Sequence, residues 1–199
     1  MLIGSAGMWN WLLSLLRRQS ATPETEAGRD SGEMLFSRPA TWEDVIATAR
    51  LLNHYQVRYL LVGGYALAAH GYVRMTEDID IAVAPDPDNS RRWVLALSEL
   101  PDGAAQALAD EHDPFEGDTL HAIRINDEIT IDVMPSVAGV AFSELEEHAQ
   151  IMLLDGVPVP VLGLNGLWKT KQGLRPKDQA DAAILGRAIE ALMQTKRDE

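Results

Sequence analysis

The sequence predicts an α+β fold: a mixed β-sheet with flanking helices and a C-terminal pair of helices. Short apolar runs of strand length alternate with segments whose apolar residues recur every three or four positions. Two further stretches, near residues 120–134 and 151–162, alternate residue by residue and read as hairpins. The last thirty-five or so residues hold helical patterns only. Strands in varied order with helices beside them favour a mixed sheet.

The first half of the expected domain alternates helix and strand. Thr41 followed by Asp44 is an N-cap signature, and it begins a helix that runs to Tyr55. Residues 59–62 form a buried strand that ends at a Gly-Gly pair. The later expected elements are a helix over 66–69 that stops at Gly71, a strand over 79–84 that stops at Pro85 and Pro87, and a helix over 90–100.

The second half contains the hairpins. Residues 101–118 are ambiguous, with one alanine-rich stretch that fits a helical turn. Strands over 120–125 and 128–134 are expected to join through a tight turn at Asn126-Asp127, and the second hairpin is expected to turn at Asp155-Gly156. The remaining expected elements are helices over 143–150, 164–174 and 176–193.

Residues 1–33 are expected to form an extension and residues 34–199 the folded domain. The extension combines a short amphipathic helix near residues 9–18 with a polar linker that composition marks as disordered. No apolar run approaches the roughly 20 residues that a membrane-spanning helix needs, and no secretory signal stands out. The chain has no cysteine. These features lead us to expect a cytoplasmic protein.

The charge of the chain limits its ligands. The formal net charge is −13, which argues against the broad basic face that binds duplex nucleic acid. The stretch from Glu77 to Asp155 is strongly acidic, whereas every lysine follows position 168. A divalent cation would prefer the acidic middle, and an anionic substrate would need the basic C-terminal part.

Three aspartates form the candidate catalytic site. Asp78 and Asp80 are two positions apart at the start of an expected strand, so both point to one face while Ile79 and Ile81 point to the core. Asp132 lies between apolar neighbours in a later strand, where an Asp is unfavourable by propensity. Like charges this close repel unless a cation lies between them, and Mg²⁺ prefers oxygen ligands. We therefore expect the three carboxylates to hold Mg²⁺, with two ions favoured and Mn²⁺ as an alternative.

The pair Gly63-Gly64 is the second part of the site. It separates a strand from a helix and precedes Asp78 by thirteen residues, 65–77. Glycines let a backbone approach a phosphate, and N–H groups at a helix start bind anionic oxygen. Taken singly, a Gly-Gly pair is usually a turn and an Asp-x-Asp is usually a solvated edge. Their conjunction with a later apolar-Asp-apolar segment indicates a nucleotide site.

This conjunction resembles the signature of the DNA polymerase β-like nucleotidyltransferases, in which Gly-Gly or Gly-Ser precedes Asp-x-Asp by about a dozen residues. The string with Arg74, Thr76, Asp78 and Asp80 resembles, more narrowly, the bacterial AbiEii and MenA-type toxin nucleotidyltransferases, over roughly residues 41–190. In the C-terminal part, the matching positions are Lys171, Arg175, Lys177, Asp178 and Asp181. A Ser is missing at position 64, so phosphate binding would rest on backbone N–H groups.

The resemblance implies transfer of a nucleoside monophosphate from an NTP to an acceptor hydroxyl. It implies metal ligation and catalysis by Asp78, Asp80 and Asp132, and nucleotide binding by Gly63, Gly64, Arg74 and Lys171. The expected acceptors are an RNA 3′ end such as tRNA, or a protein, with a role as the toxin of a toxin–antitoxin module and an antitoxin partner. The alternatives are an aminoglycoside-type small-molecule transferase and a non-catalytic member that binds a nucleotide or a partner protein.

Overall fold

The structure is a computed structural model that describes residues 37–111, 113–117, 121–173 and 176–195. The expected N-terminal helix and linker lie outside the described residues. The helices are α2 (Trp42–His54), α3 (Gly63–Ala69), α4 (Pro87–Leu97), the 3₁₀ helix η1 (Ala104–Leu108), α5 (Phe142–Glu146), α6 (Leu164–Thr170) and α7 (Pro176–Thr195). The strands are β1 (Tyr59–Leu61), β2 (Ile79–Val83), β3 (Ile123–Asn126), β4 (Thr130–Met134), β5 (Ser136–Val137), β6 (Val140–Ala141), β7 (Ala149–Leu154) and β8 (Val157–Leu162).

The main sheet has six strands in the order β3-β4-β2-β1-β8-β7. The pairs β2–β4 and β1–β8 are parallel, and the pairs β1–β2, β3–β4 and β7–β8 are antiparallel. The sheet is therefore mixed, which confirms the predicted α+β class. Strands β5 and β6 form a separate two-stranded hairpin that the sequence pattern did not predict.

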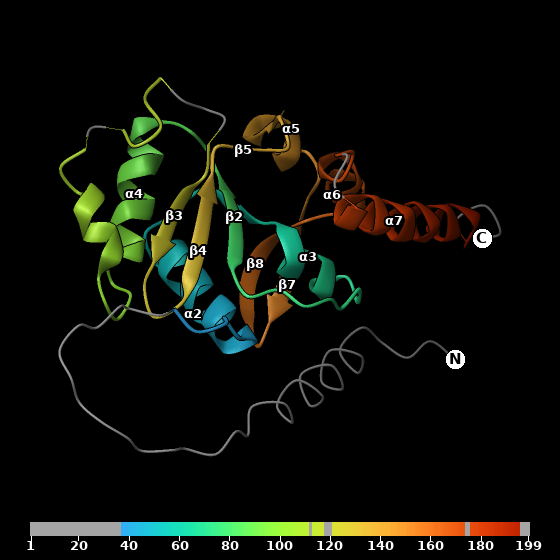
Figure 1. Cartoon of the computed structure of the whole chain (residues 1–199), viewed down its shortest axis with the longest axis horizontal. Coiled ribbons are helices and arrows are strands. Elements are labelled where there is room, and N and C mark those ends of the chain that lie inside the picture. The colour runs from blue at the N-terminus through green and yellow to red at the C-terminus, as the bar shows by residue number, and fades with distance from the viewer. Residues whose placement is uncertain (1–36, 112, 118–120, 174–175, 196–199) are drawn as a thin grey trace, which may run out of the picture. The chain divides into compact units, whose positions relative to one another are not determined.

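Helices flank this sheet and form the predicted C-terminal pair. Figure 1 shows α4 near the β3 end of the sheet and the α6–α7 pair near the β7–β8 end. Helix α2 packs against β8 and α4, while α3 packs against β2 and α6. Helices α6 and α7 pack on each other. No helix in the described part of the chain combines the length and apolarity needed to cross a bilayer.

The predicted N-cap of α2 is present in full. The Thr41 hydroxyl accepts from the Asp44 N–H at 3.3 Å, and the Asp44 carboxylate accepts from the Thr41 N–H at 2.7 Å. Arg38 also donates two hydrogen bonds to the Asp44 carboxylate. The reciprocal bonds satisfy orphan donors at the helix start, which is why the helix begins where the sequence predicted.

Two helices begin earlier than predicted. Helix α4 begins at Pro87 rather than Ser90, because Asp86 caps it by accepting from the Asn89 N–H at 2.9 Å and proline suits the first helical position. Helix α3 begins at Gly63 itself rather than at Ala66, so the Gly-Gly pair is the first part of the helix.

The end of α5 was predicted wrongly. The expected helix over 143–150 stops at Glu146, and β7 begins at Ala149. Residues 149–154 pair along their whole length with β8, and that pairing overrides local helix propensity. The predicted turn at Asp155-Gly156 is confirmed, with positive φ angles of 49° and 76°.

Asp127 fixes the turn between β3 and β4. Its side chain is 2% exposed and accepts from the N–H groups of Asp102, Ala104 and Glu128 at 2.9–3.0 Å. We expect Asp127→Ala to lower the free energy of unfolding by about 2–3 kcal/mol, because three N–H groups lose a charged acceptor that is itself buried. Urea denaturation measures this, with the exposed Asp110→Ala as a control that should change stability by less than about 0.5 kcal/mol. Equal effects would contradict a structural role for Asp127.

Candidate active site

Asp80 and Asp132 lie side by side on adjacent strands. In the parallel pair of β2 and β4, Asp80 is the direct partner of Asp132, and Ile79 and Ile131 are partners one position earlier. The isoleucines are at most 1% exposed and face the core. Because side chains alternate along a strand, the two carboxylates project together from the opposite face. The structure thus brings these two predicted residues together.

Asp78 joins the same cluster through an arginine. The guanidinium of Arg124, on β3, donates two hydrogen bonds of 2.8 Å to the two carboxylate oxygens of Asp132. Its Nη2 also lies 3.2 Å from Asp78 Oδ2. The register makes this possible, because Arg124 is the direct antiparallel partner of Asp132. The hydrogen bonds to Asp132 hold the pKa of Arg124 well above its ordinary value.

The cluster matches a divalent cation in its residue types but not in its present side-chain positions. Three carboxylates, from β2, the position before it and β4, are the donor set that Mg²⁺ prefers. As the side chains stand, however, no three His, Cys, Asp or Glu residues of the described chain are grouped to hold one metal ion. At Asp132 the Arg124 guanidinium also engages both carboxylate oxygens. The residue types and the register fit the ion, while the side chains as they stand are not gathered around one point.

Asp80 is the carboxyl most perturbed by its surroundings. Burial is the main cause that raises its pKa to about 6, and the charge of Asp132 raises it further. The N–H of Gly64 and the charge of Lys171 act in the opposite direction. A metal cation would therefore compete effectively with the proton for the Asp80 carboxylate.

The raised pKa predicts how stability depends on pH. The folded pKa of Asp80 exceeds its unfolded value, so its stabilising effect is full below about pH 4 and is lost as the pH rises through about 6. Asp80→Asn, which stays neutral, should therefore be more stable than the parent at pH 8 by at most about 3 kcal/mol, with no gain at pH 4. Urea denaturation in the presence of a chelator at the two pH values measures this. An equal effect at both would contradict the raised pKa.

The two glycines make room for other parts of the site. Gly63 has a positive φ of 61°, and a Cβ there would lie 2.6 Å from Asp80 Cγ. A Cβ on Gly64 would lie 2.6 Å from both Cβ and Oγ1 of Thr76. Gly63 thus lets the backbone pass close to Asp80, and Thr76 fills the space that a side chain at position 64 would need. The N–H of Gly64 points to the Asp80 carboxylate, so this expected phosphate donor faces the acidic cluster.

Lys171 and Arg74 converge on an aspartate of α7. The Lys171 ammonium lies 3.3 Å from Asp178 and 3.5 Å from Asp181, and Arg74 Nε lies 3.5 Å from the same Asp181 oxygen. The Lys171 and Asp181 side chains are only 11% and 9% exposed. Lys171 is near enough to Asp80 to affect its pKa, which connects this ion-pair group to the carboxylates. Arg175 and the Lys177 side chain lie outside what the structure describes.

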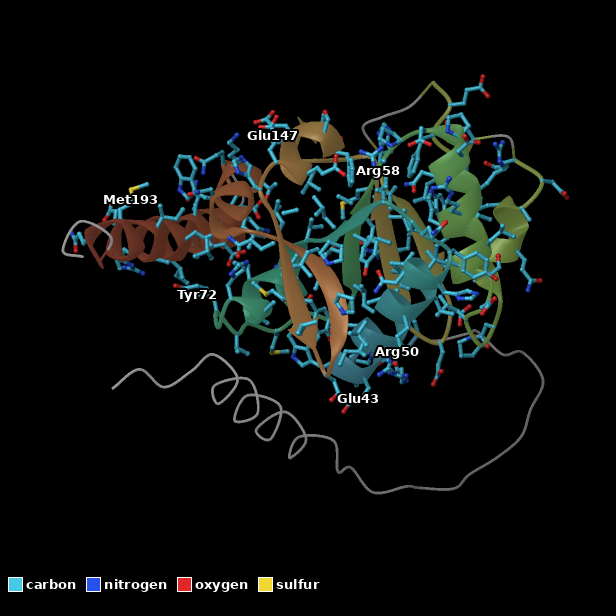
Figure 2. All side chains as sticks on the ribbon, turned by 180° about the vertical axis from the view of Figure 1, so that it is seen from behind. Glu43, Arg50, Arg58, Tyr72, Glu147 and Met193 are labelled. Atoms are coloured by element: carbon cyan, nitrogen blue, oxygen red, sulfur yellow. The ribbon has the colours of Figure 1, made fainter. Side chains whose placement is uncertain are left out.

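Two cavities of the described chain are lined by none of the three aspartates. One of about 290 Å³ is lined by Arg74 and Asp181 together with residues of the loop after α3, including Tyr72. A larger one of about 580 Å³ is lined by neither the three aspartates nor Arg124. Its lining includes His70, His148, Glu147 and Met193, and Figure 2 labels the last two, just beyond α5 and near the end of α7. The candidate active site is therefore the group of three aspartates and Arg124, and not the larger cavity.

Arg124 is the residue of the site that the sequence reasoning missed. The signal was present in the expected strand over 120–125, because Ile123 and Ile125 alternate with it. If those isoleucines face the core, Arg124 faces the side from which Asp132 projects.

Comparison with known proteins gives limited likenesses. No protein-family model matches the sequence, and no curated protein does. One similar structure is a proposed nucleotidyltransferase from Thermotoga maritima (TM1012), with 15% identity and a TM-score of 0.44, covering 77% of this chain and 89% of that one. Another is the antibiotic-resistance factor ANT(2'')-Ia, with 12% identity and a TM-score of 0.41, covering 78% and 96%. At these TM-scores neither likeness carries an argument about function.

Proposed function

We propose that the chain is a metal-dependent nucleotidyltransferase that moves a nucleoside monophosphate from an NTP to an acceptor hydroxyl. The observation that carries the proposal is the direct pairing of Asp80 and Asp132 on parallel strands, with Asp78 joined to them through Arg124. Two largely buried carboxylates this close repel each other, and positive charge beside them relieves that repulsion. The nearby glycine turn and buried lysine are parts that a triphosphate site needs.

The reaction forms one bond and breaks one. The acceptor oxygen attacks the α-phosphorus, the bond from that phosphorus to the β-bridging oxygen breaks, and pyrophosphate leaves. In this proposal Asp132 also takes the proton of the acceptor hydroxyl. Mg²⁺ bound by Asp78, Asp80 and Asp132 would supply positive charge against the triphosphate. Lys171 and Arg74 would add to that positive charge. Both are paired with Asp181, and each could also contact an incoming phosphate.

The acceptor is the open part of the proposal. The resemblance favours an RNA 3′ end such as tRNA, or a protein hydroxyl, and a toxin role with an antitoxin partner. A net charge of −13 favours a protein or a cationic small molecule such as an aminoglycoside over a long nucleic acid.

One observation favours a second candidate, a non-catalytic member that binds a nucleotide or a partner. The Arg124 guanidinium already pairs with Asp132 and contacts Asp78, so part of the charge of the acidic cluster is offset by a residue of the chain itself. Two measurements together distinguish an enzyme from a non-catalytic binder. Calorimetry with a non-hydrolysable NTP and Mg²⁺ reports nucleotide binding, and a transfer assay reports activity. Nucleotide binding without transfer to any acceptor would favour this second candidate.

The function is tested by transfer of label. The full chain is incubated with each of the four NTPs, labelled at the α-phosphate, with Mg²⁺ and separate pools of tRNA, protein and aminoglycosides. We expect one pool to gain label, which names both the donor and the acceptor class. Label that stays in the NTP with every pool would contradict the proposed activity.

A further inference from the structure

Arg124 occupies the oxygens that the proposed metal would need. Its guanidinium engages both carboxylate oxygens of Asp132 and reaches Asp78 Oδ2, so a single cationic group bridges two carboxylates from different parts of the chain. A divalent cation bound by Asp132 would have to share oxygens that this group now contacts, and its charge would repel the guanidinium beside it. The two cations cannot engage those oxygens fully at the same time.

The surroundings of Arg124 allow it to leave. Its side chain is 55% exposed, whereas those of Asp132 and Asp78 are 15% and 36% exposed. It extends from β3, which lies at one end of the strand order, so the guanidinium can turn into solvent without disturbing the core. Asp132, by contrast, lies within β4, in register with β2, and its side chain is much less exposed. Of these two partners, the arginine is therefore the one with room to move away.

We infer that Arg124 acts as a built-in competitor of the catalytic metal: its guanidinium balances Asp132 and Asp78, and metal binding requires it to swing out. The inference rests on the proposed function, because it concerns the ion that this function needs. The exchange sets the affinity of the site for the ion, and it offsets part of the negative charge of the cluster when the ion is scarce. Arg124 is thus a regulatory residue of the site, and its contacts do not require it to touch the substrate.

The structure gives a matched control for this inference. Arg91, on α4, also pairs with an aspartate, Asp88, and its side chain is 56% exposed. Neither residue belongs to the carboxylate cluster, so Arg91→Ala makes the same change in charge outside it. Arg124→Lys is a second informative variant, because an ammonium keeps the charge but cannot form the two parallel hydrogen bonds.

The test measures the affinity for Mn²⁺ by electron paramagnetic resonance of the free ion, with the full chain at pH 7.5. Because the Arg124 side chain is more than half exposed, the expected gain for Arg124→Ala is moderate: the Kd should fall about tenfold, equal to ~1.4 kcal/mol. Arg124→Lys should lie between this variant and the parent, and Arg91→Ala should change the Kd by less than about twofold. Circular dichroism verifies the fold of each variant. Should Arg124→Ala not fold, Arg124→Lys decides, with a fall in Kd expected.

The outcomes separate this inference from the proposed function. An unchanged or higher Kd for Mn²⁺ in the Arg124 variants would overturn the inference. If Asp80→Asn nevertheless abolishes Mn²⁺ binding, the proposed metal site still stands. If the parent and all variants fail to bind Mn²⁺, with or without a non-hydrolysable NTP, the inference and the metal-dependent function both fail. A lower Kd in the Arg124 variants with Arg91→Ala unchanged supports the competition.

Discussion

Asp80→Asn should reduce nucleotidyl transfer by at least about 10³-fold while leaving the fold intact. Asp80 is the carboxyl at the centre of the cluster, paired directly with Asp132 and within reach of the Gly64 N–H and the Lys171 charge. The amide keeps the shape of the side chain but loses the anionic oxygen, so its electrostatic stabilisation of the metal and the transition state is lost. Label transfer from the preferred NTP at pH 7.5 measures the effect.

The control for this variant is Asp88→Asn. Asp88 is an exposed aspartate on α4 that pairs with Arg91 outside the cluster, and its loss should leave transfer within about twofold of the parent. Thermal unfolding should show that Asp80→Asn is at least as stable as the parent at pH 8. Full activity in Asp80→Asn would remove the carboxylate cluster from any account of catalysis.

Gly63→Ala should abolish transfer and destabilise the domain by about 2–5 kcal/mol. Two costs add at this position. A φ of 61° is unfavourable for a residue with a side chain, by about 1–2 kcal/mol, and overpacking adds about 1–3 kcal/mol because the new Cβ would lie 2.6 Å from Asp80 Cγ. The Asp80 side chain would have to move, so the folded fraction should also lose activity.

Gly71 provides the comparison that separates the two costs. It has a φ of 89°, but a Cβ added there would meet no atom within 4 Å. Gly71→Ala should therefore show the backbone cost alone, about 1–2 kcal/mol, and should retain transfer in the folded protein. Urea denaturation gives the stabilities, and transfer is assayed where each variant is folded. Equal losses of activity in the two variants would argue that Gly63 has no special relation to Asp80.

Most elements of the fold could be predicted from local patterns, because those patterns match what stabilises the elements. The Thr41–Asp44 cap and the Asp155-Gly156 turn are examples, since each depends on residues next to one another in the chain. The wrong end of α5 is different in kind. Residues 147–150 have no local signal against a helix, and the strand at 149 forms because β8, which follows it, pairs with it.

The candidate site could be predicted in its residue types but not in its contacts. Alternation alone placed Asp80 and Asp132 on the faces opposite their isoleucine neighbours, and the strand order that pairs them is a property of the whole sheet. The partner of Arg124 depends on one turn. A two-residue turn at Asn126-Asp127 would have paired Arg124 with Ile129, whereas the observed register pairs Asn126 with Thr130 and so Arg124 with Asp132.

The most direct test of the central claim is the position of a bound Mn²⁺ in crystals grown with a non-hydrolysable NTP. The account predicts anomalous scattering from Mn²⁺ beside the oxygens of Asp80 and Asp132, with the triphosphate next to it and the Arg124 guanidinium turned away from Asp132. Mn²⁺ or nucleotide bound instead in the cavity of His70 and His148, with Arg124 still on Asp132, would contradict the account.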